Sequence, residues 1–230
     1  MKVLEVSNIS KKLGKKQVLN DVSFFLCANE IVGLVGCNGV GKTTLLKVIL
    51  GLQNGNKGFI KINGYDVGKC ADMALYKVGA IIENPDMYGY LTGRENMELV
   101  ARYYKNVDKS RIDELIKLVG LEDSIDMKVK KYSLGMKQRL GIALSLINKP
   151  NLLILDEPTN GLDPEGIICL RKLLLQLKDI TILISSHNLN ELNNLCNRVL
   201  FMKEGRIVKD ILCDDIDLEG KFMEVVCFNE

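Results

Sequence analysis

Gly-Cys-Asn-Gly-Val-Gly-Lys-Thr, residues 36–43, is the stretch that decides the fold. It fits the pattern G-x-x-x-x-G-K-[ST], in which a glycine-rich loop cradles phosphate groups. The apolar run 31–35 before it is typical of a buried strand, and the apolar run 45–50 after it ends at Gly51, as helices often do. A strand, a glycine-rich loop and a helix in this order predict a phosphate-binding core. The alternative is a glycine-rich turn before an ordinary helix.

Each residue type in this loop has a chemical reason. Gly36, Gly39 and Gly41 let the backbone bend so that its N–H groups converge on phosphate oxygens. The start of the helix adds positive potential. Lys42 is expected to reach the β- and γ-phosphates, and the Thr43 hydroxyl to ligate Mg²⁺. The other expected nucleotide contacts of the loop are Cys37, Asn38, Val40 and Thr44.

A second group of candidate residues follows the apolar run 152–155. Four apolar residues in a row indicate a buried central strand, and parallel sheets bind ligands at the carboxyl ends of their strands. Asp156 is expected to hold Mg²⁺, directly or through water. Glu157 points in another direction and can polarise the water that attacks the γ-phosphate. The alternative is an acidic loop after a strand.

A second candidate anion site lies at Ser133, a natural N-cap for a helix that begins near Gly135. A serine hydroxyl, a glycine backbone and a helix N-terminus together suit a phosphate group. A head-to-tail dimer would bring this site of one chain to the phosphate loop of the other. The alternative is a well-capped helix that binds nothing.

His187 is the single histidine of the chain and ends the expected strand 181–186. A lone histidine is more often structural or a surface residue. A strand end on the phosphate side of the sheet instead favours contact with the γ-phosphate. Both interpretations stay open on this residue alone.

Bulk composition narrows the class of protein. The 230 residues suit one domain, and 47% hydrophobic residues suffice for a sizeable core. A net charge of +2 gives no indication of nucleic-acid binding. No apolar run approaches the ~18 residues of a membrane span. No signal peptide is evident, so we expect a cytoplasmic protein.

The cysteines favour a reducing compartment, because their number is odd and no C-x-x-C occurs. With one histidine present, a zinc site is not expected either. Cys37 differs from the rest because it lies inside the phosphate loop, where positive potential favours a reactive thiol. The alternative is a small neutral filler. The others are Cys27, Cys70, Cys169, Cys196, Cys213 and Cys227.

The order of the expected elements predicts an α/β fold. Strands dominate the first ~65 residues, which include an Asn63-Gly64 turn. Helices follow, opened by Thr92, Ser110 and Ser133. Strands then alternate with helices, the first of which is capped by Asp163, and a hairpin closes the chain.

We therefore expect a P-loop NTPase core of the RecA-like kind with a mainly parallel sheet. An N-terminal antiparallel β-subdomain and an inserted helical subdomain complete it. Residues 1–230 would form a single domain. Within it, residues 1–84 and 150–230 make up the β-subdomain and core, and residues 85–149 the helical subdomain.

The phosphate loop, the acidic pair, the Ser133 helix start and His187 together resemble the motifs of the ATP-binding subunit of ABC transporters. The resemblance extends over nearly the whole chain. Six motifs in the family's order are highly specific, whereas a phosphate loop alone is not. Residues 80–96 also resemble a narrower group, the bacitracin-resistance and lantibiotic-immunity exporters. The matches are the Walker A motif at 36–43, the Walker B strand at 152–156, the catalytic glutamate at Glu157, the signature motif at 133–138, the D-loop at 160–163 and the switch histidine at His187.

The resemblance implies an ATP hydrolase that uses ATP and Mg²⁺, with Glu157, His187 and Lys42 as catalytic residues. It implies a homodimer around two nucleotides, to which Ser133 and Gly135 contribute from the opposing copy. Gln138 and Asp163 are further expected nucleotide contacts. It also implies separate permease subunits at the inner face of the cell membrane, which provide the only membrane contact, and no nucleic-acid partner. The implied task is export of a peptide antibiotic or similar amphiphile.

Two departures from the family bear on mechanism. Glu83 stands where the family usually has Gln, and its carboxylate is expected to bind Mg²⁺ or orient water. Leu13 stands near the usual position of an aromatic residue that stacks on adenine, so it offers only apolar contact. We also expect the segment 83–91, with Met87, Tyr88 and Tyr90, to seat a helix of the permease. The alternative for each of these three residues is packing against the protein's own core.

Two other classes of function stay open. One is a soluble ABC-type ATPase that acts on DNA, chromosomes or ribosomes, although neither a coiled-coil insertion nor a second cassette occurs in the sequence. The other is a scaffold that docks on a permease without hydrolysing ATP, which the joint presence of Lys42, Asp156, Glu157 and His187 opposes.

Overall fold

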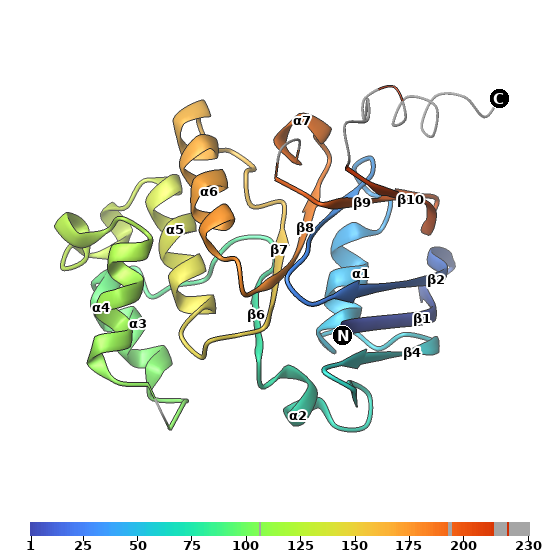
Figure 1. Cartoon of the computed structure of the whole chain (residues 1–230), viewed down its shortest axis with the longest axis horizontal. Helices are drawn as coiled ribbons and strands as arrows, with labels where there is room; N and C mark the ends of the chain where they lie inside the picture. The colour runs from blue at the N-terminus through green and yellow to red at the C-terminus, as the bar shows by residue number, and fades with distance from the viewer. Residues whose placement is uncertain (106, 193–194, 214–219, 221–230) are drawn as a thin grey trace.

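The computed structural model of the chain describes residues 1–105, 107–192, 195–213 and 220. Its strands form a four-stranded sheet in the order β2-β1-β4-β5 and a six-stranded sheet in the order β10-β9-β3-β8-β7-β6. Helix α1 lies between the two sheets, and the other long helices lie beyond the six-stranded sheet (Figure 1). The predicted α/β class is therefore confirmed.

The smaller sheet is antiparallel, as predicted for the N-terminal part of the chain. Its pleat turns alternate apolar side chains, such as Leu4, Val6 and Leu26, into the core around α1. Asn63 and Gly64 have positive φ and form the predicted tight turn into the last strand. The strands are β1 (Lys2–Leu13), β2 (Lys16–Cys27), β4 (Lys57–Ile62) and β5 (Tyr65–Asp66).

The larger sheet is parallel except for its last pair, β9 and β10, which confirms the predicted mainly parallel sheet. Its central strands are almost wholly buried, because helices or the second sheet cover both faces. The parallel order brings the carboxyl ends of β3, β7 and β8 to the same edge. The strands are β3 (Ile31–Val35), β6 (Val78–Ile81), β7 (Leu152–Asp156), β8 (Thr181–Ser186), β9 (Arg198–Lys203) and β10 (Arg206–Leu212).

Two apolar cores hold the layers together. On one side of the larger sheet, Leu45 and Leu46 of α1 (Lys42–Ile49) pack against both sheets. On the other side, Leu140 of α5 (Leu134–Ser145) and Leu170 of α6 (Pro164–Gln176) belong to a second cluster. Burial of these side chains fixes the three helices α1, α5 and α6, each of which starts at a predicted nucleotide-binding position.

The chain between β6 and β7 is helical, as predicted. Thr92 caps α3 (Gly93–Ala101) in a capping box with Glu95, as predicted, although the helix ends before Tyr104. The predicted start of the next helix at Ser110 is wrong, because Asp108 caps α4 (Lys109–Leu118). The Asp108 carboxylate accepts from the Arg111 N–H at 3.0 Å, and the Ser110 hydroxyl donates to Asp108 at 2.8 Å. A carboxylate is the better acceptor for the orphan N–H groups of a helix start.

The remaining helices are short. They are α2 (Ala71–Leu75), α7 (Leu189–Leu192) and the 3₁₀ turns η1 (Glu122–Ser124) and η2 (Val129–Lys131). In the part of the chain that the structure describes, none of the helices has the length and apolar character required to cross a bilayer.

Candidate active site

The phosphate loop joins β3 to α1 and depends on its glycines. Gly39 has φ 76° and Gly41 has φ 115°, in the left-handed region that favours glycine. A Cβ on Gly36 would lie 2.5 Å from the Met202 carbonyl oxygen, so the loop also packs too closely for a side chain there. The backbone can therefore take up the phosphate-cradling turn that the sequence predicts.

Lys42, Glu157 and His187 lie in one connected group. The buried Lys42 ammonium donates to the Gly36 carbonyl at 2.7 Å and lies 3.1 Å from Glu157 Oε1. The other carboxylate oxygen, Oε2, lies 2.7 Å from His187 Nδ1. The three predicted catalytic residues thus meet, although they come from three separate elements. Glu157 lies between a cation and an imidazole, both within reach of its carboxylate.

Asp156 and Thr43 form a second connected group at the same edge. The Thr43 hydroxyl donates to Asp156 Oδ2 at 2.8 Å, and the Ser185 hydroxyl donates to Asp156 Oδ1 at 2.6 Å. Asp156 is buried. Hydroxyl and carboxylate oxygens are the ligands that Mg²⁺ prefers. The donor chemistry at Thr43 and Asp156 therefore fits Mg²⁺.

Within the described residues, no three His, Cys, Asp or Glu side chains are grouped closely enough to hold a metal ion by themselves. Mg²⁺ usually keeps several waters and shares its coordination with substrate phosphates, so two protein ligands such as Thr43 and Asp156 would be enough for it. The site is therefore compatible with a metal that arrives together with a nucleotide.

Glu83 lies apart from the other predicted metal ligands. Its carboxylate forms an ion pair with Lys47 at 2.6 Å and is mostly exposed. Among the described residues, no hydrogen bond or ion pair joins Glu83 to Thr43 or Asp156. Its φ of 64° is unusual for a residue with a side chain and marks a tight turn after β6.

The second candidate anion site is a cavity of about 380 Å³ between the starts of α5 and α6. Ser133, Gly135, Gln138 and Asp163 all line it, so four predicted nucleotide contacts are brought together. The Ser133 hydroxyl accepts from the Met136 N–H at 3.2 Å and so caps α5. The Gln138 amide nitrogen is buried and has no hydrogen-bond partner within the described part of the chain.

A further cavity, of about 450 Å³, flanks the phosphate loop. Its walls come from Cys37, Asn38, Gly39 and Val40, from β2 and from the turn between β9 and β10. The predicted base contact Leu13 ends β1, is 46% exposed and does not line this cavity. Cys37 is exposed and forms no disulfide, whereas Cys196 is buried. Cys227 lies outside the described residues.

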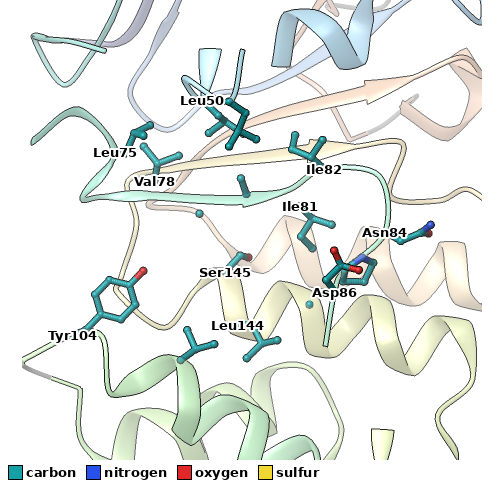
Figure 2. A pocket seen from close by; sticks show the side chains of 16 residues that line it. Leu50, Leu75, Val78, Ile81, Ile82, Asn84, Asp86, Tyr104, Leu144 and Ser145 are labelled. Carbon is teal, nitrogen blue, oxygen red and sulfur yellow. The ribbon is translucent and has the colours of Figure 1, made fainter. Parts of the chain in front are cut away.

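A groove of about 530 Å³ runs along the edge strand β6, from the ends of α1 and α2 to α3 and α5 (Figure 2). Val78 and Ile82 lie on its sheet side, and Leu144 lies on its helical side. Next to it, the exposed rings of Tyr88 and Tyr90 pack edge to face with centroids 5.7 Å apart. Met87 instead packs against the core.

Comparison with known proteins decides the family, because the sequence profile of ABC transporters matches residues 19–160. The chain belongs to the ABC transporter family. It is 41% identical over 231 residues to the lantibiotic transport ATP-binding protein SrtF of Streptococcus pyogenes, covering 99% of each chain. It is 40% identical over 226 residues to the bacitracin transport ATP-binding protein BcrA of Bacillus licheniformis, covering 96% of this chain and 74% of the relative.

Solved structures agree with this assignment. The ATP-binding subunit of an ABC transporter superposes with a TM-score of 0.83 at 31% identity, covering 96% of this chain and 94% of that one. A dimeric ATP-binding cassette bound to ADP and Pi has the same fold, with a TM-score of 0.82 at 24% identity and coverage of 93% and 100%. The predicted family and RecA-like fold are thus confirmed.

As a member of this family, the chain is an ABC-type ATP-binding subunit and ATP hydrolase. Cassettes of the family bind nucleotide, dimerise and function with transmembrane subunits. The predicted resemblance to bacitracin and lantibiotic transporters is also confirmed by the two named relatives.

Sequence reasoning missed Ser185 in this ABC cassette. A polar residue near the end of an otherwise apolar strand was the available signal. Its role became visible only with the register of the sheet, in which Asp156 of β7 pairs with Ser185 of β8. Lys47, the partner of Glu83, was missed for the same reason, since helix and turn meet only in the fold.

Proposed function

We propose that this chain is the ATPase subunit of a bacterial exporter for a peptide antibiotic or a similar amphiphile. The likeness to SrtF carries this proposal, because that lantibiotic transport protein and this chain cover 99% of each other. The bacitracin transport protein BcrA supports the same class of cargo. Cargo contacts themselves would belong to separate membrane subunits.

The catalytic roles follow from the connected group at the sheet edge. Lys42 exchanges its partner Glu157 for the γ-phosphate when nucleotide binds. Glu157 is then free to orient the attacking water and to accept its proton. His187, which contacts the same carboxylate, stabilises charge on the γ-phosphate. Lys42, Glu157 and His187, which contact one another in the chain without nucleotide, thus become the residues that contact the nucleotide and the attacking water.

Mg²⁺, when bound, would neutralise charge on the β- and γ-phosphates. Thr43 and Asp156 are the residues that would hold it, because their oxygens already converge. Glu83 joins them only if it leaves Lys47, an exchange that a mostly exposed ion pair allows.

Two copies face each other head to tail around two nucleotides. The cavity with Ser133, Gly135, Gln138 and Asp163 on one copy then covers the phosphate loop of the other. Support comes from Gln138, whose buried amide nitrogen has no partner among the described residues of one chain. A buried donor of this kind costs free energy unless a ligand or a second copy satisfies it.

A separate membrane subunit docks on the groove that runs along β6. The groove is lined mainly by apolar residues and is continuous with the segment 83–91 through Asn84, Pro85 and Asp86. An apolar groove flanked by exposed Tyr88 and Tyr90 suits a short amphipathic helix. Docking there would place the membrane subunit against both the sheet and the helical block.

The decisive experiment is Glu157→Gln in the purified chain. We expect phosphate release to fall by about a thousandfold, in line with the loss of a general base, while ATP binding persists and an ATP-bound dimer accumulates in size-exclusion chromatography. Glu122→Gln, at an exposed carboxylate on η1, is the matched control and should hydrolyse normally.

Three results would overturn parts of the proposal. Unchanged turnover in Glu157→Gln would remove the assigned base. Absence of phosphate release from the unmodified chain and its assembled complex would favour the docking scaffold. Failure to co-purify with any membrane subunit from its host would favour a soluble ATPase.

A further inference from the structure

Ser185 joins the two acidic residues of the site. Its hydroxyl donates to Asp156 Oδ1 at 2.6 Å and accepts from the Glu157 backbone N–H at 2.9 Å. The side chain is 0% exposed, so water does not compete for either bond. One buried hydroxyl thus uses its donor on the first acidic residue and its acceptor on the second.

The bond to Asp156 fixes the direction of that carboxylate. With Oδ1 held by Ser185 and Oδ2 by Thr43, the carboxylate cannot rotate without breaking a hydrogen bond. Groups of this kind, which do not touch the metal themselves, orient the ligands that do. Without Ser185, Asp156 Oδ1 would be a buried acceptor that has lost its hydroxyl donor.

The bond to Glu157 acts on the backbone. Glu157 has φ 47°, in the left-handed region that a residue with a side chain rarely adopts. Such a conformation persists only where the surroundings determine it. The N–H bond to Ser185 is one such determinant, and it holds the backbone from which the carboxylate reaches Lys42 and His187.

We propose that Ser185 is a positioning residue, which aims Asp156 at the bound metal and holds the backbone of Glu157 for catalysis. The inference rests on the roles proposed above for these two acidic residues. It predicts a selective defect: Ser185→Ala should weaken metal-assisted nucleotide binding and turnover, and leave metal-free nucleotide binding unchanged.

Thr181 provides a matched control on the same strand. It is 1% exposed, and its hydroxyl likewise donates once, to the Cys27 carbonyl at 3.1 Å, and accepts once, from the Asn29 N–H at 3.0 Å. It lies at the opposite end of β8 from the site. Thr181→Val therefore removes an equivalent pair of hydrogen bonds without touching Asp156 or Glu157.

The experiment compares the dissociation constant of a fluorescent ATP analogue in Mg²⁺ with that in EDTA, for the full chain and each variant. In Ser185→Ala we expect the Mg²⁺-dependent gain in affinity to fall about tenfold, as is usual when the residue that orients a metal ligand is removed, and kcat to fall by a similar factor. Thr181→Val should keep both values within about twofold of the unmodified chain. Thermal melting of both variants reports any shared loss of stability.

The outcomes separate this inference from the proposed function. If Asp156→Asn abolishes the Mg²⁺-dependent gain and Ser185→Ala retains it, the role of Ser185 is wrong. An equal loss in Ser185→Ala and Thr181→Val would mean that Ser185 acts on stability alone, which also overturns the inference. If Asp156→Asn itself retains the gain, the proposed metal role of Asp156 fails first.

Discussion

The two predicted phosphate sites differ in how far one chain completes them. At the phosphate loop, Lys42, Glu157 and His187 satisfy one another, and Thr43, Asp156 and Ser185 form a second closed set. At the cavity near Ser133, the Ser133 and Asp163 side chains cap their own helices, and Arg139 donates to the Val119 and Gly120 carbonyls. There the Gln138 amide nitrogen is buried without a partner among the described residues.

This difference suggests separate tasks for the two sites: the first binds nucleotide within one chain, and the second takes part in the association of two copies. The first site has its charges and hydroxyls in place before a ligand arrives, so a single chain has what it needs to hold nucleotide. The second site offers a buried donor, the Gln138 amide nitrogen, that nothing in the described part of the chain uses. A second copy carrying nucleotide would supply the missing acceptor, and the free energy gained would drive association.

The largest effect that would distinguish the two sites is expected when a negative charge is placed in the second site, because dimerisation should be lost while nucleotide binding by one chain remains. A Cβ on Gly135 would meet only Leu162 Cδ2, at 3.8 Å, so Gly135→Asp fits the isolated chain. Its carboxylate would repel a γ-phosphate and remove the benefit of the helix N-terminus. We expect hydrolysis and ATP-driven dimerisation to fall about a hundredfold, the usual effect of losing one preorganised electrostatic contact, with nucleotide binding by the single chain unchanged.

The control for Gly135→Asp adds the same charge to another helix start. Ala71→Asp lies in the exposed first turn of α2, where an acidic residue is favourable. Dimerisation is measured by light scattering with the hydrolysis-deficient Glu157→Gln chain. Normal assembly of the Gly135→Asp chain would show that the second cavity is not an interface.

A smaller effect is expected from thiol modification, which distinguishes the two sites by their own cysteines. Cys37 lines the cavity at the phosphate loop, and Cys169 lines the second cavity. Cys196 is buried, and burial raises the pKa of its thiol, which keeps it unreactive. Alkylation of Cys37 should therefore be what blocks nucleotide binding by the single chain.

The measurement is the rate at which iodoacetamide abolishes binding of a fluorescent ATP analogue. We expect Cys37→Ser to slow that loss at least about tenfold, because the reagent then meets no thiol at the first site. Cys169→Ser, the matched variant at the second site, should lose nucleotide binding as fast as the unmodified chain. Equal rates in Cys37→Ser and the unmodified chain would contradict the prediction.

The features that were predicted correctly from the sequence are those that a few neighbouring residues determine. The glycine loop, the Ser133 cap and the acidic pair after an apolar strand each depend on a few adjacent residues. It could not predict that Ser185 bonds Asp156, because that contact depends on the register between two strands that are far apart in sequence. The wrong start of α4 arose differently: Asp108 and Ser110 both suit an N-cap, and it is Asp108 that has the extended backbone of a cap and accepts the Arg111 N–H.

The smallest expected effect is on selectivity for the nucleobase. Among the described residues that line the two cavities, none has an aromatic ring on which the base could stack. Leu13 is half exposed and gives apolar contact only, whereas base–aromatic stacking contributes ~1–3 kcal/mol. We expect kcat/KM for GTP to lie within about tenfold of that for ATP, a difference of ~1.4 kcal/mol. Leu13→Tyr should tighten both nucleotides, and Leu175→Tyr, at a leucine of similar exposure on α6, should not. Strict dependence on ATP would mean that base recognition comes from the cavity beside Cys37, since its polar wall includes Lys16 and Gln17.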